Sequence, residues 1–274
     1  MPEAFIHQIF YSPQTRAMLD PGFAALDNSA NKRPDWREYW PIRTFLLGTR
    51  LREDAFYAFL SPKFGAKTGL DAASVFAFIE REGGTSDMLL FSPFFDQIAY
   101  PINIFEQGAM QHADTMPTFK ESVACVAPGV DFEALVTDST NTVFCNFFAA
   151  RPAFWRQWMD MCEGIFAVAE NEDTEFARRL NANTHHDGGG APTKVFVIER
   201  IASLLLATGK RWRATAFNPQ GLPWSGSALG EFRLELAFLD ALKIAYARQG
   251  HRQYLDAFHQ LRGLITRSLQ QAKS

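Results

Sequence analysis

The sequence predicts a single α/β domain with a largely parallel central sheet flanked by helices, followed by a helical C-terminal extension. Three observations favour this class. Short apolar runs rich in β-forming residues alternate with longer segments of helical periodicity, as parallel strands joined by helical crossovers require. No internal repeat and no long linker divides the 274 residues. The closing segments carry helical patterns only, so we expect the α/β domain over residues 1–226 and the extension over residues 227–274.

The first strand and the first long helix are predicted near the N-terminus. Residues 4–12 contain many β-forming residues and end at a proline, so they predict a buried strand. A polar loop over 26–34 follows. The segment 36–48 then predicts a helix, with Asp35 as its N-cap and with Pro41 marking a kink or a late start.

A second and a third strand are predicted around another helix. The run AFYAFL at residues 55–60 is continuously apolar, which is typical of a buried strand. Asp71 is expected to cap a helix that runs to about Arg81. Gly83-Gly84 then turns the chain into a third strand over residues 87–93. This alternation favours parallel neighbours in one sheet.

The second half of the chain is mostly helical. Residues 94–112 show a helical pattern with interruptions, and VFCNFFAA at 143–150 predicts a further strand. Pro152 is expected to begin a long amphipathic helix, and residues 195–209 predict another. Two C-terminal helices are expected near residues 227–248 and 251–271.

Composition narrows the function classes. The net charge is −3 and no long basic block occurs, so nucleic-acid binding has no electrostatic support. The three cysteines form no CxxC pair, which favours a reducing, cytoplasmic setting. The N-terminus lacks the pattern of a signal peptide, and no segment approaches the roughly 20 apolar residues of a transmembrane helix. We therefore expect a cytoplasmic protein, with any membrane contact being peripheral and on the inner face.

Several common sites lack support. His185-His186-Asp187 could ligate zinc or manganese, but adjacent ligands in a glycine-rich loop more often form a solvated loop. Neither a GxGxxG nor a P-loop motif occurs, which disfavours classical dinucleotide and P-loop sites. Cys145 is expected in a buried strand and Cys162 on the apolar side of a helix, where cysteines are usually structural.

Polar residues within apolar segments are more informative. Glu38 lies among aromatic residues, Asn146 interrupts the strand VFCNFFAA, and Glu199-Arg200 interrupts VFVIERIASLLL. A charge pair in an apolar helix is costly unless it is paired or faces a cleft, although an exposed helix face remains the alternative. Asp96, Glu106 and His112 follow the third strand, near the sheet edge where ligands usually bind.

These segments resemble, in order, a family of bacterial capsular-polysaccharide and lipopolysaccharide biosynthesis proteins that are regarded as glycosyltransferase-like. The resemblance covers about residues 4–208. VFVIERIASLLL is its most specific part, and Ser61-Pro62-Lys63 stands where the family has a His-Tyr-Arg-Arg run. The other matching segments are Asp27-Asn28, Asn31, Glu38 within WREYW, FEQGAMQH with Gln107 and His112, and CNFFAARPAFWRQWMDMCEGIF.

The resemblance implies a GT-A-type, Rossmann-like domain that transfers a sugar from a nucleotide-diphosphate-sugar donor. The acceptor would be a glycan or lipid-linked precursor of capsule, lipopolysaccharide or O-antigen. The alternative is a non-catalytic module that binds a sugar nucleotide or a partner of a glycan-assembly complex. The missing Asp-x-Asp motif favours the alternative, whereas retention of Asn146 and Glu199-Arg200 favours the enzyme.

The resemblance also implies roles for individual residues. Lys63 and Arg200 would neutralise the departing diphosphate in place of a metal, which leaves the use of Mn²⁺ or Mg²⁺ open. Asp96 or Glu199 would act as the catalytic base. Residues expected at the donor are Tyr11, Asp27, Asn28, Lys63 and Asn146, and residues expected at the acceptor are His112 and Trp224, the latter on an exposed loop.

Two further expectations concern the packing of the chain. The aromatic residues of the central segments are expected in the core rather than on a sugar-stacking surface: Phe94, Phe95, Phe105, Phe147, Phe148, Phe154 and Trp155. The apolar face of the C-terminal helices should pack against the domain, with a homodimer contact as the second interpretation. The basic residues of this tail are too dispersed for a membrane anchor.

Overall fold

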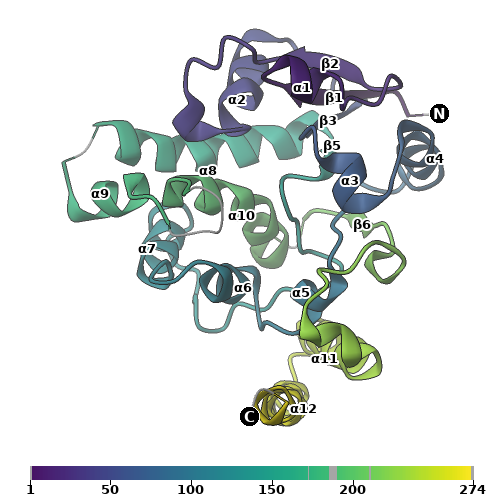
Figure 1. Ribbon diagram of the computed structural model, residues 1–274, viewed down its shortest axis with the longest axis vertical. Helices are drawn as coiled ribbons and strands as arrows, with labels where there is room; N and C mark the ends of the chain where they lie inside the picture. The colour runs from purple at the N-terminus through teal and green to yellow at the C-terminus, as the bar shows by residue number, and fades with distance from the viewer. Residues whose placement is uncertain (1, 172, 185–189, 210, 273–274) are drawn as a thin grey trace.

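The computed structural model describes residues 2–171, 173–184, 190–209 and 211–272. Within them, six strands form one sheet in the order β2-β1-β3-β5-β4-β6 (Figure 1). The strands are β1 (Ala4–Phe10), β2 (Ala24–Asp27), β3 (Phe56–Leu60), β4 (Met88–Leu90), β5 (Phe148–Ala150) and β6 (Ala214–Ala216). All neighbours pair in parallel except β5, which is antiparallel to both β3 and β4. The mixed α/β class is thus confirmed, with a mostly parallel sheet.

Helices cover both faces of the sheet. The α-helices are α1 (Pro13–Arg16), α2 (Tyr39–Gly48), α3 (Phe64–Thr68), α4 (Ala72–Glu82), α5 (Phe95–Ala99), α6 (Ile104–Gln111), α7 (Met116–Val126), α8 (Pro152–Asn171), α9 (Glu175–Asn181), α10 (Thr193–Thr208), α11 (Arg233–Gln249) and α12 (Gln253–Gln271). Short 3₁₀ turns are η1 (Pro34–Trp36), η2 (Pro219–Gly221) and η3 (Ala228–Glu231). Side chains of β3 alternate between the two faces, as a strand requires. Tyr57 and Phe59 pack with α2, α8 and α10, whereas Ala58 packs with α3 and α4.

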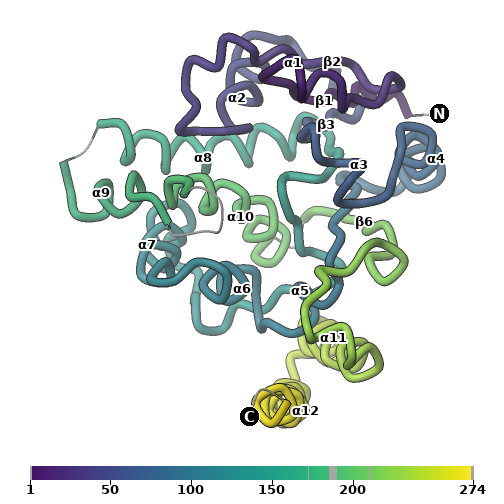
Figure 2. The backbone as a smooth tube through the Cα atoms, in the orientation of Figure 1, coloured from purple at the N-terminus to yellow at the C-terminus, as the bar shows by residue number. Residues whose placement is uncertain are grey.

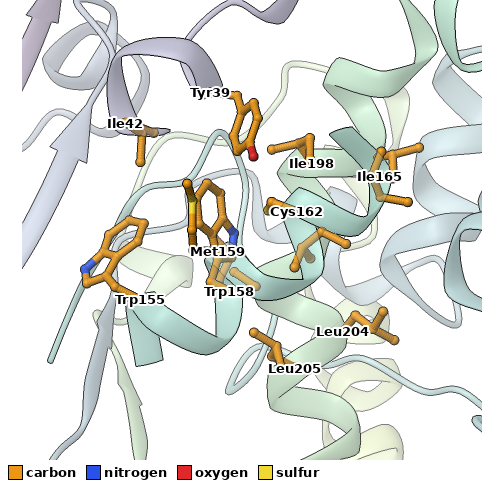
Figure 3. Close-up of a cluster of buried hydrophobic side chains, with 14 of the residues drawn as sticks. Tyr39, Ile42, Trp155, Trp158, Met159, Cys162, Ile165, Ile198, Leu204 and Leu205 are labelled. Carbon is orange, nitrogen blue, oxygen red and sulfur yellow. The ribbon is translucent and has the colours of Figure 1, made fainter. Parts of the chain in front are cut away.

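The larger core cluster is built around α8. Figure 3 shows Trp155, Trp158 and Cys162 of this helix between side chains of α2 and of α10. All three are fully buried, and the Trp155 indole donates a hydrogen bond to the carbonyl of Tyr57 at 3.0 Å. Six of the seven aromatic residues expected in the core are buried, which confirms that interpretation for them. Phe94 is the exception, because it is only half-buried.

Several element predictions are confirmed. Asp71 caps α4 by accepting a hydrogen bond from the amide of Ser74 at 2.8 Å. Pro152 begins α8, and Pro41 is the third residue of α2, so it marks a late start. Proline is tolerated there because the first turn of a helix leaves its amides without intrahelical partners.

Three predictions about the secondary-structure elements were wrong. Asp35 does not cap α2; its carboxylate instead pairs with the buried ammonium of Lys194 at 2.6 Å. Part of the predicted loop 26–34 belongs to β2, an edge strand whose exposed alanines give no clear alternation. The strand expected over 143–150 is confined to β5, because Cys145 and Asn146 have positive φ angles of 55° and 54°. Neither residue is therefore part of a strand.

The C-terminal helices α11 and α12 pack together at the end of the molecule opposite β1 and β2 (Figures 1 and 2). Their apolar side chains form a third cluster with α5. Lys243 of α11 is fully buried, and its ammonium donates to the carbonyls of Ile98 at 2.7 Å and of Pro101 at 2.8 Å. Burial lowers the pKa of Lys243 to about 8, partly opposed by Asp240. In the part of the chain that the structure describes, no helix has both the length and the apolar character needed to cross a bilayer.

Lys243→Met is expected to lower the free energy of unfolding by about 2–4 kcal/mol, because two buried carbonyls and Asp240 lose their partner. The pKa of Lys243 is depressed in the folded state, so its ionisation disfavours folding below pH 8 and this cost disappears toward pH 10.5. The free energy of unfolding of Lys243→Met should therefore fall further below that of the parent chain as the pH rises from 8 to 10.5. Urea unfolding at several pH values measures it, with Arg248→Met, an exposed change on the same helix, as the control. Equal stability of the two variants would contradict the assignment.

Candidate functional site

The carboxyl ends of the parallel strands meet at one edge of the sheet, and the segments that follow them line a cavity. In the sheet, β2 lies on one side of β1 and β3 lies on the other. The order of the strands therefore reverses at β1, so β1 and β3 flank a topological switch point. Ligands of open α/β sheets usually bind at this point. The first cavity has a volume of about 280 Å³ and is lined by Tyr11 after β1, Asn28 after β2, and Ser61 and Lys63 after β3.

A second cavity of about 500 Å³ adjoins the first. Phe94 follows β4 and lines it, together with side chains of α6 and the segment Ser225–Ser227. Four residues line both cavities, and we call them the junction: Lys67, Cys145, Phe196 and Glu199. The two cavities thus adjoin at the junction, which carries the charged side chains of Lys67 and Glu199, and we call them together the cleft.

Backbone strain is concentrated along this cleft. Six non-glycine residues of the described chain have positive φ angles, and five of them line a cavity: Asn31, Arg37, Phe94, Cys145 and Asn146. Such conformations cost about 1–3 kcal/mol each and persist where the surrounding structure enforces them, commonly at functional sites. The backbone angles are an observation separate from the cavity volumes, and both indicate the cleft as the candidate site.

Lys67 and Cys145 are in contact at the junction. The Lys67 ammonium lies 3.0 Å from the Cys145 sulfur. Burial alone would lower the pKa of Lys67, but Cys145 and the carboxylates of Glu199 and Glu38 hold it above its usual value. Burial raises the pKa of the Cys145 thiol to about 11. At neutral pH the pair is thus an ammonium and a thiol, so Cys145 is not an activated nucleophile.

Glu199 presents a carboxylate to both cavities. Within the described residues, no hydrogen bond or ion pair within 4 Å engages this carboxylate, although it feels the charges of Arg200 and Lys67. Burial raises the pKa of Glu199, and the nearby Glu38 adds to the shift. A carboxylate with a raised pKa that faces a cleft is a candidate for a catalytic base.

Arg200 lines the second cavity, but its donors are bound within the protein. Its Nε donates to the carbonyl of Ile104 at 3.1 Å, and its Nη1 to that of Phe196 at 2.7 Å. Its Nη2 donates to the side chain of Gln107 at 3.2 Å. The guanidinium lies against Gly108, where a Cβ atom would approach it to 2.4 Å. Arg200 therefore joins α10 to α6, and its expected role toward the diphosphate stays a prediction.

The structure brings together four of the five residues expected at the donor. Tyr11, Asn28, Lys63 and Asn146 all line the first cavity. Asn146 is buried, and its Oδ1 has no hydrogen-bond partner in the structure. Asp27 lies outside the cavity on the exposed end of β2, where its carboxylate accepts a hydrogen bond from the amide of Ser29 at 2.7 Å.

The remaining expected residues are dispersed. His112 is buried and lines the second cavity, and the centroid of its ring lies 3.8 Å from that of the Phe196 ring. Trp224 lies outside both cavities and is half-buried against Phe95, so the expected exposed position was wrong. Asp96 is fully buried and does not line the cleft. Burial would raise the pKa of Asp96, but hydrogen bonds from Ser225 and its neighbours lower it, which disfavours a role as base.

Two cationic residues of the site were missed in the sequence. Lys67 lies one helical turn after Lys63, and this i, i+4 spacing could have shown that both face the same side of a helix. Arg37 had no such signal, because its left-handed backbone arises from the turn between η1 and α2. Both Arg37 and Lys63 are exposed.

The residues of the cleft do not form a metal site. The motif His185-His186-Asp187 lies outside the described residues. Elsewhere in the described ranges, no group of three or more His, Cys, Asp or Glu side chains could hold a metal ion. The two carboxylates of the first cavity, Glu38 and Glu199, have Lys67 beside them. We therefore derive no chemistry through Mn²⁺ or Mg²⁺.

The chain matches no family model, no curated protein and no solved structure.

Proposed function

We propose that the chain is a glycosyltransferase of GT-A type that transfers a sugar from a nucleotide-diphosphate-sugar to a glycan hydroxyl. The observation that carries this proposal is the first cavity, which opens at the β1/β3 switch point and is lined by three cationic residues. These are Arg37, Lys63 and Lys67. Anionic cofactors and substrates bind at this place in open α/β sheets, and cationic side chains supply the matching charge.

The lining of the first cavity suits the parts of such a donor. The amides of Asn28 and Asn31 and the hydroxyl of Tyr11 can hydrogen-bond a base and a ribose near the ends of β1 and β2. The diphosphate would lie nearer to Lys63 and Lys67, and the sugar would then point toward the junction. The ordered resemblance to capsule-biosynthesis proteins supports the same assignment.

The junction supplies the groups that a single displacement needs. Glu199 would accept the proton of the acceptor hydroxyl while the oxygen of that hydroxyl attacks the anomeric carbon of the donor sugar. The bond from that carbon to the diphosphate breaks, and the electron pair leaves with the nucleoside diphosphate. Lys67 would stabilise the charge that develops on this leaving group. A displacement of this kind inverts the anomeric configuration.

A second candidate is a module that binds a sugar nucleotide without turning it over. One observation favours it: the end of β3 carries Ser61-Pro62-Lys63 instead of paired carboxylates. The two candidates differ in one measurement, the release of free nucleoside diphosphate from a donor that binds.

Lys67→Met is expected to weaken donor binding about tenfold or more, equivalent to about 1.4 kcal/mol, because a half-buried ammonium is lost from the cavity. Lys63→Met, which removes an exposed charge four residues earlier, should have a smaller effect. Uridine-, guanosine-, cytidine- and thymidine-diphosphate sugars are first screened by thermal shift, and titration calorimetry then measures the affinity of each variant. The absence of a shift with every donor, or equal affinities of Lys67→Met and the parent chain, would contradict the assignment.

A further inference from the structure

We infer that the second cavity binds an uncharged saccharide and selects against acidic ones; this rests on the proposed function, for which the bound saccharide is the acceptor. Three glutamines line the cavity: Gln97, Gln107 and Gln111. Ser225 and Ser227 add hydroxyl groups, so the polar lining consists largely of neutral donors and acceptors. Such groups hydrogen-bond sugar hydroxyls without requiring a charge on the ligand.

Asp96 does not line this cavity, but it accepts hydrogen bonds from polar residues that do. Its buried carboxylate accepts hydrogen bonds from the amide of Ser225 at 3.0 Å, the hydroxyl of Ser227 at 2.9 Å and the side-chain amide of Gln97 at 3.0 Å, and also from the hydroxyl of Ser225. Gln111 in turn donates to the Oε1 of Gln97 at 3.1 Å. A fixed network of this kind holds the groups of the wall in place before a ligand arrives.

The charges around the cavity disfavour an anionic ligand. Arg200 is the cation on its wall away from the junction, and three of its donor groups are bound to the main chain and to Gln107. The carboxylate of Asp96 lies behind the wall, and that of Glu199 lies at the junction. The two cations at the cavity, Arg200 and Lys67, are thus offset by two carboxylates, so a carboxylate or phosphate on the ligand would lose its hydration without a net positive charge to compensate.

The apolar part of the lining matches the other face of a sugar. Phe94, Phe144 and Phe196 are half-buried and contribute ring surface to the cavity. Binding pockets typically combine such apolar walls with a few polar groups that fix orientation. A sugar packed between the rings and the amide wall would reach Glu199 with one hydroxyl. The cavity therefore has the composition of a neutral acceptor site that ends at the proposed base.

The test uses the full chain without nucleotide and saturation-transfer NMR. The probes are the neutral methyl glycosides of glucose, galactose and N-acetylglucosamine, and the acidic methyl glucuronide. Each is used at about 10 mM, which saturates a site with a Kd near 1 mM. We expect at least one neutral glycoside to bind and the glucuronide to bind about fivefold more weakly or worse, as roughly 1 kcal/mol of uncompensated desolvation gives. Binding of no neutral glycoside, or equal binding of glucuronide, overturns the inference.

Two variants locate the effect. Gln111→Lys places a cation on the exposed rim of the second cavity and should raise the affinity for glucuronide to that for the neutral glycoside. Met110→Lys adds the same charge at the adjacent exposed position of α6, outside the lining, and should change neither affinity. Unchanged discrimination in Gln111→Lys also overturns the inference. Because no nucleotide is present, glycoside binding can persist when every nucleotide-sugar fails to bind, so failure of the proposed donor site is recognised separately.

Discussion

Glu199→Gln is expected to lower kcat by about 10²–10⁴-fold, the usual contribution of a general base, and to raise the melting temperature of the same protein. Glutamine keeps the shape of the side chain but cannot accept the proton of the acceptor hydroxyl. It also removes a carboxylate whose ionised form is disfavoured by burial and by the neighbouring Glu38. Loss of function together with a gain in stability is typical of active-site residues.

The stability gain should depend on pH in a defined direction. Because the pKa of Glu199 is raised above its ordinary value of 4.5, the folded state binds this proton more tightly than the unfolded state. The stability that this contributes is fully present below pH 4.5 and is lost as the pH rises through the folded-state pKa. The melting temperature of Glu199→Gln should therefore exceed that of the parent chain by more at neutral pH than at pH 4.

The change in kcat and the change in melting temperature are both measured on the parent chain and on Glu199→Gln. Nucleoside diphosphate release follows kcat, which should rise with pH in the parent chain as Glu199 ionises, and calorimetry follows the melting temperature. Glu38→Gln is the matched control, because Glu38 lines the first cavity but lies outside the junction. Its kcat should fall less. If Glu199→Gln kept kcat within about threefold, well below the usual contribution of a base, the base would have to be another group.

Arg200→Ala is expected to lower the free energy of unfolding by about 3–5 kcal/mol, because a buried, hydrogen-bonded cation is removed and a cavity is left. The carbonyls of Ile104 and Phe196 lose their side-chain donors, and the ring of Phe119 loses the guanidinium 4.9 Å from its centre. Burial lowers the pKa of Arg200 to about 10, which still leaves it charged at neutral pH. For a domain whose total stability is typically about 5–15 kcal/mol, this loss is large.

Two further variants separate a structural role of Arg200 from ligand binding. Arg200→Lys keeps the charge but has one donor group, so it should recover only part of the lost stability. Gly108→Ala adds a Cβ atom 2.4 Å from the guanidinium and should destabilise the fold with Arg200 still present. Urea unfolding measures all three. An Arg200→Ala protein that stayed within about 1 kcal/mol of the parent but no longer bound the donor would favour the phosphate-binding role instead.

Local patterns were sufficient for most of the elements. The continuous apolar run 55–60 predicted β3, and the position of Asp71 predicted the start of α4, because both depend on residues close in the sequence. The same reasoning singled out Glu199-Arg200 as a pair that is costly in an apolar helix unless it is paired or faces a cleft, with an exposed helix face as the alternative, and the structure shows that both residues line the cleft. That reasoning could not distinguish between Asp96 and Glu199 as the base.

The sequence by itself determined the α/β class, the main strands and helices, and the presence of costly polar residues within apolar segments. Only the tertiary structure decided which of them share a cleft. VFCNFFAA has the composition of a strand, yet packing holds Cys145 and Asn146 in left-handed conformations at the cleft. Asp96 became a buried support and Lys67 joined Glu199 at the junction. Strand pairing brings together residues that lie far apart in the chain, and the short-range preferences of a sequence carry little information about such contacts.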